Sequence, residues 1–265
     1  MRIAILSDLH LVSPRDPFKE VHAKRAHFAR AWPSAKRMCA KLREAAPDLV
    51  ISLGDLVEWY SDENRDFAIE ILNELKVPWL VTPGNHDFEM YSRQADGTVG
   101  DCLPARDCEE EVTRSWHAVG IELGNRMIDA GNAALLLMNS ACGTAPEGTR
   151  EWLNETLGQH SNNFLFTHIP LDIPPIRRFI LSVDPDRDLK KYVQSGVPWL
   201  FADCLRGRVQ TTFFGHLHFG GQLCVDSTTM YFLGLSIAAS GREYRDMGQA
   251  MILDLDGSKP QVISL

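Results

Sequence analysis

Residues 2–10 read RIAILSDLH, an apolar run that leads directly into an acidic residue and a histidine. The run Arg2–Ser7 is apolar on both faces of an extended chain, and this pattern predicts a short buried strand. Two similar runs, Leu49–Leu53 and Pro78–Thr82, predict a second and a third strand. Each run ends just before polar residues of the types that bind metals, so the strand ends are candidate positions for a site.

Two amphipathic segments separate these three strands. Ser34–Ala46 is predicted to be a helix that Ser34 caps and Pro47 ends, and Asp62–Leu75 is predicted to be a helix with acidic residues in its first turn. Strands that alternate with helices imply a parallel sheet, because parallel neighbours need a crossover connection.

The second half of the chain is predicted to be rich in short strands. The predicted helices there are Asp107–Val119 and Thr149–Leu157. The predicted strands are Arg126–Asp129, Ala133–Asn139, Phe164–Thr167, Val209–Phe214, Gly221–Val225, Met230–Leu233, Ser236–Ala239, Ala250–Leu253 and Gln261–Ser264. Phe88–Arg106 and Leu171–Asp188 show no clear period and are predicted to be loops that could cover a cleft. Residues 1–265 contain no repeat and no linker composition, so we expect one α/β domain with two packed sheets and helices outside.

Composition restricts the class of protein. Hydrophobic residues make up 45% of the 265 residues, which is enough for a sizeable core. The formal net charge is -8, so binding of nucleic acid through bulk attraction is not expected. None of the six cysteines forms a C-x-x-C pair, and reduced thiols in a cytoplasmic protein are the simplest interpretation. We expect no signal peptide and no membrane span.

Ligand-type residues gather at the predicted strand ends. They are Asp8, His10, Asp55, Asn85, His86, Asp87, His168, His216 and His218. Each motif alone has an ordinary alternative: Gly54-Asp55 could be a turn or a helix cap, and His168 could be a core histidine. In an open α/β sheet, however, ligands bind outside the carboxyl ends of the strands, so five such loops predict one metal site.

The pair His216 and His218 carries a further expectation. The two histidines alternate with Leu217 along the chain, so the course of the strand decides where their imidazoles point. Both imidazoles can reach one centre only if the chain departs from regular strand geometry at this point.

The ordered set of motifs resembles the calcineurin-like metallophosphoesterase superfamily. The motifs are Asp8-x-His10, Gly54-Asp55, Gly84-Asn85-His86-Asp87, His168 and Gly215-His216-x-His218. The resemblance implies a four-layer αββα sandwich with a dinuclear metal centre at the carboxyl ends of the strands.

The resemblance also implies a role for each residue. It implies that one metal is held by Asp8, His10 and His218, the other by Asn85, His168 and His216, and that Asp55 bridges the two. His86 would lie beside the centre without being a ligand and would contact the phosphate or protonate the leaving oxygen.

Elementary chemistry agrees with such a centre. Two cations about 3.5–4 Å apart neutralise a phosphoester and lower the pKa of a bridging water towards neutrality. Imidazole, carboxylate and amide ligands together suit Mn, Fe or Zn better than Ca or Mg. A bridging ligand needs two oxygens, which the carboxylate of Asp55 provides. His86 titrates in the range that a general acid needs.

The substrate is less closely defined by the sequence. Asp87 and the modest length resemble small bacterial phosphodiesterases, whereas protein Ser/Thr phosphatases of the superfamily have Glu after Gly-Asn-His. A metal-dependent phosphoesterase acting on a small phosphodiester or phosphomonoester is therefore the first hypothesis. A Mn-dependent nuclease of the DNA-repair branch is the second, although no basic track is evident. A non-catalytic scaffold is the third, although such members typically lose a ligand or the residue equivalent to His86.

Other residues have two interpretations each. Arg177 and Arg178 could reach a substrate phosphate or be solvated. Trp59 and Tyr60 could stack on a base or sugar, or belong to the core or rim. Arg242 and Tyr244 could line the cleft or be exposed.

Overall fold

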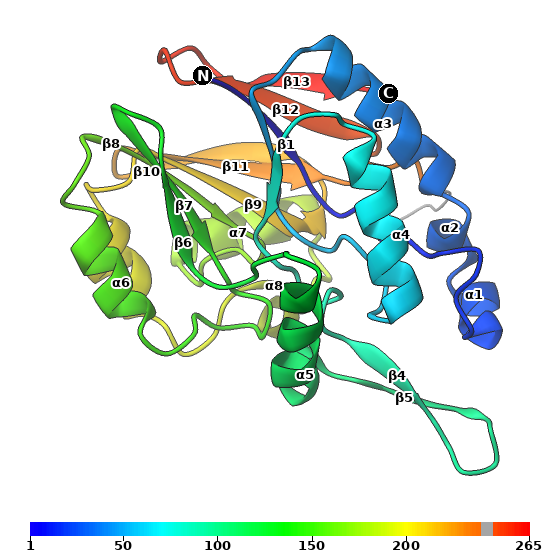
Figure 1. The fold of residues 1–265 in the computed structure, drawn as a ribbon. Coiled ribbons are helices and arrows are strands. Elements are labelled where there is room, and N and C mark those ends of the chain that lie inside the picture. The colour runs from blue at the N-terminus through cyan, green and yellow to red at the C-terminus, as the bar shows by residue number, and fades with distance from the viewer. Residues whose placement is uncertain (240–245) are drawn as a thin grey trace.

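The computed structural model describes residues 1–239 and 246–265. Two large sheets lie face to face with helices on their outer sides (Figure 1). This architecture confirms the predicted four-layer αββα sandwich. A third, two-stranded sheet extends away from the sandwich as a hairpin.

The first sheet has the order β13-β12-β1-β2-β3. Its strands are β1 (Arg2–Leu6), β2 (Leu49–Ser52), β3 (Trp79–Val81), β12 (Gln249–Asp254) and β13 (Gln261–Ser264). The first three run parallel, as the crossover argument predicted, and the two strands from the end of the chain join antiparallel.

The second sheet has the order β10-β11-β9-β8-β7-β6. Its strands are β6 (Arg126–Asp129), β7 (Ala133–Met138), β8 (Asn162–Thr167), β9 (Thr211–His218), β10 (Gly221–Val225) and β11 (Thr228–Gly234). The four central strands are parallel and the two edge strands antiparallel, so both sheets bring several carboxyl ends to one edge.

Helices surround the two sheets, some on their outer faces and others at their edges (Figure 1). They are α1 (Lys19–Lys24), α2 (Ala26–Ala29), α3 (Trp32–Glu44), α4 (Asp62–Asn73), α5 (Ala105–Ala118), α6 (Thr149–Thr156), α7 (Pro174–Val183), α8 (Leu189–Tyr192) and the π-helix η1 (Leu200–Leu205). Residues of α3 and α4 share one core cluster with the first sheet, and residues of α6, α7 and η1 share another with the second.

Alternation along the strands creates the layers. Ile3 and Ile5 lie in the core between the sheets, where Phe213 of β9 also packs, whereas Ala4 and Leu6 face the helices. All five side chains are buried. Strands that are buried on both faces read as continuous apolar runs, which explains the first motif of the sequence.

Two predicted loops contain regular structure. Phe88–Arg106 holds the hairpin of β4 (Met90–Arg93) and β5 (Val99–Leu103), and Leu171–Asp188 holds α7, so both loop predictions were wrong. The hairpin strands have no buried residue and lack an apolar period. In α7, the two prolines occupy the first turn, where the missing N–H groups are no loss to the helix.

Three smaller predictions also need correction. Ser34 does not cap the helix, because α3 starts at Trp32 and the Ser34 hydroxyl instead donates to the Ala31 carbonyl and accepts from the Ala238 amide. Ser236–Ala239 is not a strand. The segment between the first motif and Ser34, where the sequence predicted no helix, contains α1 and α2.

Two general expectations can be compared with the described residues. No helix among them is long and apolar enough to cross a membrane. All six cysteines are free; Cys39, Cys108 and Cys204 are buried, whereas Cys102 and Cys224 are exposed.

The core between the sheets provides a test of the packing. Phe213 is fully buried, and its ring stacks on Phe166 and Tyr231 with centroids 5.1 and 5.4 Å away. We expect Phe213→Ala to lower the free energy of unfolding by about 3–5 kcal/mol, because it leaves a cavity between the layers. Urea denaturation measures the change. Val262→Ala is the matched control, since Val262 is 55% exposed and its replacement should cost little; equal losses would contradict this description.

Candidate metal centre

All seven predicted ligands lie at the carboxyl-end edge of the two sheets. The side chains of His, Asp and Glu residues there form candidate metal-binding groups whose ligand atoms all lie within 4.8 Å of one another. The first group is Asp8, His10, Asp55 and His218, and the second is Asp55, His168 and His216; His10, Glu58 and His86 form a further candidate group beside them. Asp55 is common to the first two groups.

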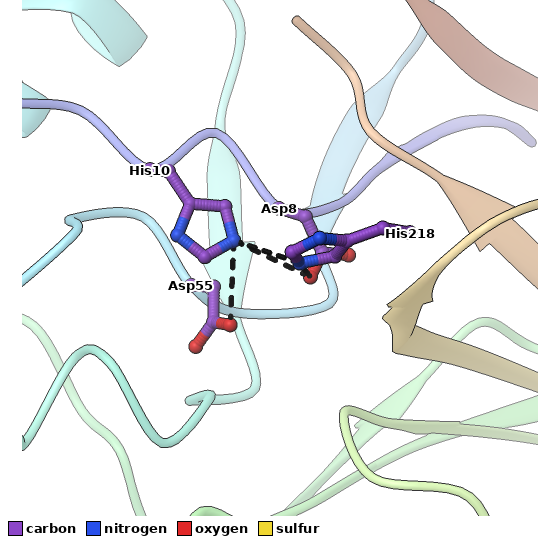
Figure 2. Close-up of side chains that lie close together, drawn as sticks. All are labelled: Asp8, His10, Asp55 and His218. Carbon is purple, nitrogen blue, oxygen red and sulfur yellow. Dashed lines mark hydrogen bonds and ion pairs between the residues drawn. The ribbon is translucent and has the colours of Figure 1, made fainter. Parts of the chain in front are cut away.

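The first group is compact (Figure 2). His10 Nε2 lies 3.0 Å from His218 Nε2, 3.8 Å from Asp8 Oδ1 and 3.6 Å from Asp55 Oδ2. His218 Nε2 lies 3.4 Å from Asp8 Oδ1. Four potential ligand atoms from two loops and β9 therefore converge on one point.

The second group adjoins the first through the same carboxylate oxygen. Asp55 Oδ2 lies 3.2 Å from His168 Nε2, which in turn lies 3.2 Å from His216 Nδ1. In each of the two rings, the other nitrogen donates a hydrogen bond to a backbone carbonyl group. His168 Nδ1 donates to Leu53 O at 2.7 Å and His216 Nε2 to Lys191 O at 2.9 Å, so the nitrogens left over face the centre.

Asn85 adds an amide oxygen. Its Nδ2 donates to Glu89 Oε1 at 2.9 Å, which fixes the orientation of the amide because an ionised carboxylate can only accept. The buried Asn85 Oδ1 has no hydrogen-bond partner in the described part of the chain. An unpaired buried acceptor is costly, and a cation would satisfy it.

These observations fit a pair of cations. Imidazole nitrogens lie close to each other and to carboxylate oxygens, and a positive ion between them would relieve the repulsion among lone pairs. The donor set combines imidazole nitrogens with carboxylate and amide oxygens, all of which are metal ligands in proteins.

The backbone is strained at the centre. Nine non-glycine residues of the described chain have positive φ, and five of them are candidate ligands: Asp8, His10, Asp55, His216 and His218. Side chains rarely adopt this conformation, and it concentrates at functional sites. His216 and His218 have φ of 70° and 60°, so β9 departs from regular geometry as the sequence predicted.

Glycines allow the loops to approach one another. A Cβ on Gly84 would lie 2.1 Å from Asp55 Oδ1, and one on Gly54 would lie 2.3 Å from Gly84 N. A Cβ on Gly215 would lie 2.2 Å from Ser7 Oγ. The glycine that precedes each of these motifs is therefore a steric requirement of the site.

Two carboxylates with no role assigned from the sequence organise the site. Glu58 Oε2 lies 2.5 Å from His10 Nδ1, and Arg25 pairs with the same carboxylate. Buried Asp87 accepts from the amides of Gly84 and Leu56 at 2.9 and 2.7 Å, and so joins the second and third motifs. Asp87 is part of the third motif, whereas only the position of Glu58 three residues after Asp55 could have pointed to it.

Charge within the site shifts the pKa values strongly. Burial would raise the pKa of Asp55, but His168, His86 and His10 outweigh it and hold the pKa well below its usual range. Burial opposes the charged form of His168 too, but Asp55 outweighs it and raises the pKa of His168 to about 9. Burial and the nearby His168 lower the pKa of His216 to about 3.

His86 lies beside both groups. Its amide donates to Asp55 Oδ1 at 2.9 Å, and its Nδ1 donates to Glu58 O at 2.8 Å. Burial lowers the pKa of the imidazole, but the carboxylates of Asp55, Glu58 and Glu89 outweigh it and raise the pKa to about 10. Bound cations would oppose this rise.

A cavity of about 380 Å³ opens over the centre. Its lining includes Asp55, Asn85, His86, His216 and His218, together with residues of two walls. Glu89, Pro104, Ala105 and Arg106 form one wall, and Lys190, Lys191 and Tyr192 belong to the other. Part of the predicted loop Phe88–Arg106 thus borders the cavity, whereas no residue of Leu171–Asp188 is among the described residues that line it.

A family description, calcineurin-like phosphoesterase, matches residues 1–220. The chain belongs to this family. This calcineurin-like phosphoesterase matched no curated protein in a sequence search.

Solved structures share the fold of this calcineurin-like phosphoesterase. A dimetal phosphatase from Danio rerio is 13% identical, with a TM-score of 0.59, over 100% of this chain and 98% of that one. Phosphopantetheinyl hydrolase from Mycobacterium tuberculosis is 15% identical, with a TM-score of 0.51, over 88% and 89%. A purple acid phosphatase from yellow lupin seeds is 11% identical, with a TM-score of 0.59, over 95% of this chain and 48% of that one. At such identities the likeness establishes the fold.

The remaining candidates lie mostly outside the cavity. Arg177 pairs with Asp172, and neither Arg177 nor Arg178 is among the described residues that line the cavity. Trp59 is buried in a small cluster with Val12 and Val21, which agrees with a core role. Arg242 and Tyr244 lie outside the described residues.

The close approach at Gly84 provides a test. We expect Gly84→Ala to lower the affinity for Mn²⁺ by roughly 10–100-fold or more, because the added methyl group displaces the Asp55 carboxylate. Equilibrium dialysis measures bound Mn²⁺, and circular dichroism checks the fold. Gly158→Ala is the control, since nothing lies within 4 Å of its added Cβ; unchanged affinity in Gly84→Ala would refute the steric argument.

Proposed function

We propose that this chain is a metal-dependent phosphoesterase that hydrolyses a small phosphodiester or phosphomonoester. The observation that carries the proposal is the shared carboxylate: Asp55 Oδ2 lies 3.6 Å from His10 Nε2 in one group and 3.2 Å from His168 Nε2 in the other. A carboxylate that faces both sets of ligands could serve two cations through Oδ2 alone, so the expectation that bridging needs both oxygens is not required here, where Oδ1 accepts from the His86 amide.

The proposed ligands divide as the two groups do. Asp8, His10 and His218 would hold one cation, Asn85, His168 and His216 the other, and Asp55 would bridge them. When bound, the two cations would offset the negative charge of the ester and make a water molecule more acidic. The protein contributes orientation, since a carbonyl oxygen fixes the outer nitrogen of both His168 and His216.

We propose His86 as the acid that protonates the leaving oxygen. Its Nδ1 is engaged by the Glu58 carbonyl, which can only accept, so this nitrogen carries a proton and Nε2 is the atom left for the substrate. The residue lines the cavity, where its side chain is 22% exposed. Neighbouring carboxylates favour its protonated form at neutral pH.

The identity of the metals, the type of ester and the cellular compartment are proposed on separate grounds. We propose Mn, Fe or Zn as the native metals, because imidazole and amide ligands accompany the carboxylates. A preference for phosphodiesters rests on the resemblance of the motifs to small phosphodiesterases. We propose a reducing compartment such as the cytoplasm, which six free cysteines support.

The bridging role predicts a large effect. We expect Asp55→Ala to reduce hydrolysis of bis(p-nitrophenyl) phosphate by Mn²⁺-loaded protein by roughly 10³-fold or more, since both cations lose a ligand. Bound Mn²⁺ should fall in parallel. His117→Ala, an exposed position on α5, is the control. Wild-type activity in Asp55→Ala would overturn the proposed function.

If His86 is the acid, its replacement should lower activity without lowering metal binding, unlike the replacement of Asp55. We expect His86→Ala to lower kcat by roughly 10²–10⁴-fold while bound Mn²⁺ stays at the wild-type level, because an acid is lost and no ligand is. A p-nitrophenyl leaving group needs little protonation, so an alkyl phosphodiester should lose more activity. A parallel loss of Mn²⁺ would instead assign His86 to the ligands.

A further inference from the structure

Three cationic side chains line the cavity, although the chain as a whole is acidic. The chain has a net charge of -8, yet Arg106, Lys190 and Lys191 all line this one cavity. Arg106 comes from one wall and the two lysines from the other. All three are exposed, so they are accessible to a ligand.

These cations are poorly compensated by the protein. Among the described residues, neither Arg106 nor Lys190 has an ion-pair partner, and the carboxylate nearest to Lys191 Nζ is that of Asp188, 3.9 Å away. The carboxylate of Glu89 also lines the cavity, but it lies 2.9 Å from Asn85 Nδ2 and 3.4 Å from His86 Nδ1. The carboxylate of Glu89 therefore interacts with residues of the metal centre and is not an ion-pair partner of the three cations.

The lysine wall is fixed to the metal centre. Lys191 O accepts from His216 Nε2 at 2.9 Å, and the Tyr192 ring packs on the His216 ring with centroids 5.0 Å apart. Arg187 in turn lies 4.2 Å above the Tyr192 ring. The turn that carries the lysines is thus held beside a proposed ligand and is not a free surface loop.

The other wall contributes one cationic side chain. Pro104, Ala105 and Arg106 all line the cavity at the start of α5. Asp107 lies in the same first turn and offsets the partial positive charge of the helix end, so the guanidinium of Arg106 is the positive group that this wall supplies.

We propose that Arg106, Lys190 and Lys191 form a subsite for a second anionic group of the substrate, a phosphoryl or carboxyl group separate from the phosphoester that is cleaved. This inference rests on the proposed function and specifies its substrate class. The cavity has the volume of a small-molecule site, roughly 300–1,000 Å³. Ala105, Ala141 and Ile169 in its lining would contact the carbon skeleton between the two anions.

Two pairs of substrates separate the possible sources of the second anion. One pair is thymidine 5′-(p-nitrophenyl phosphate) and its 3′-phosphorylated form, which differ only in a phosphoryl group. The other is glycerol 2-phosphate and 2-phosphoglycerate, which differ in a carboxyl group. We expect the wild-type protein with Mn²⁺ to show a KM about three- to ten-fold lower for the doubly anionic member of at least one pair.

The double variant Lys190→Gln/Lys191→Gln tests the residues. We expect it to abolish this KM advantage and to leave kcat for the doubly anionic substrate within about three-fold, because the lysines bind and do not react. Lys76→Gln/Lys259→Gln removes the same charge at exposed positions outside the cavity lining. This control should retain the advantage, which distinguishes a local subsite from the overall field.

The outcomes also distinguish this inference from the proposed function. If no ester is hydrolysed, bis(p-nitrophenyl) phosphate included, the proposed function fails. If esters are hydrolysed but neither pair shows a KM difference, the subsite is refuted while the phosphoesterase stands. An advantage that survives in the lysine double variant refutes the assignment to these residues.

Discussion

The buried carboxylate of Asp55 is the constraint on which the site depends. A fully buried charge is costly unless several partners compensate it, and here the His86 amide, His10 and His168 all lie within 3.6 Å of its oxygens. Its charge also acts on its surroundings. Burial, together with the nearby Asp55, raises the pKa of Asp87 to about 7, although that residue accepts backbone amides.

The surroundings of the Asp55 carboxylate require positive φ angles at candidate ligands and a glycine where a side chain would not fit. Asp8 and Asp55 have φ of 54° and 50°, and Gly84 leaves no room for a Cβ beside Asp55. Such strain persists only where the surrounding structure fixes it. The two packed sheets provide that support, since the fully buried Ile5 and Phe213 belong to the core between them, next to the strand ends.

The sequence predicted what depends on local pattern. The run before Asp8 has the composition of a doubly buried strand, and the ligand types follow it directly, so both the strand and its polar end could be inferred. The hairpin β4–β5 was missed because its strands lack an apolar period. Helix α7 does have one, since Ile176, Ile180 and Val183 share a face that packs on the second sheet's core cluster, but its prolines and arginines were interpreted as signs of a loop. The contact of Glu58 with His10 joins two separate loops, and the hydrogen bond from His216 to Lys191 O spans 25 residues, so neither was visible in a single motif.

The metal centre and the walls of the cavity belong to different parts of the fold, but they are not fully independent. The proposed ligands lie on strand ends that the sheets hold rigid, whereas Arg106 and Lys190 lie on the starts of helices that can change without altering the sheets. Substrate choice could therefore vary while the metal site persists. Lys191 is the exception, because its carbonyl fixes the ring of His216 while its side chain lines the cavity. A side-chain replacement there leaves the carbonyl in place, whereas a shift of the whole turn would alter substrate binding and metal geometry together.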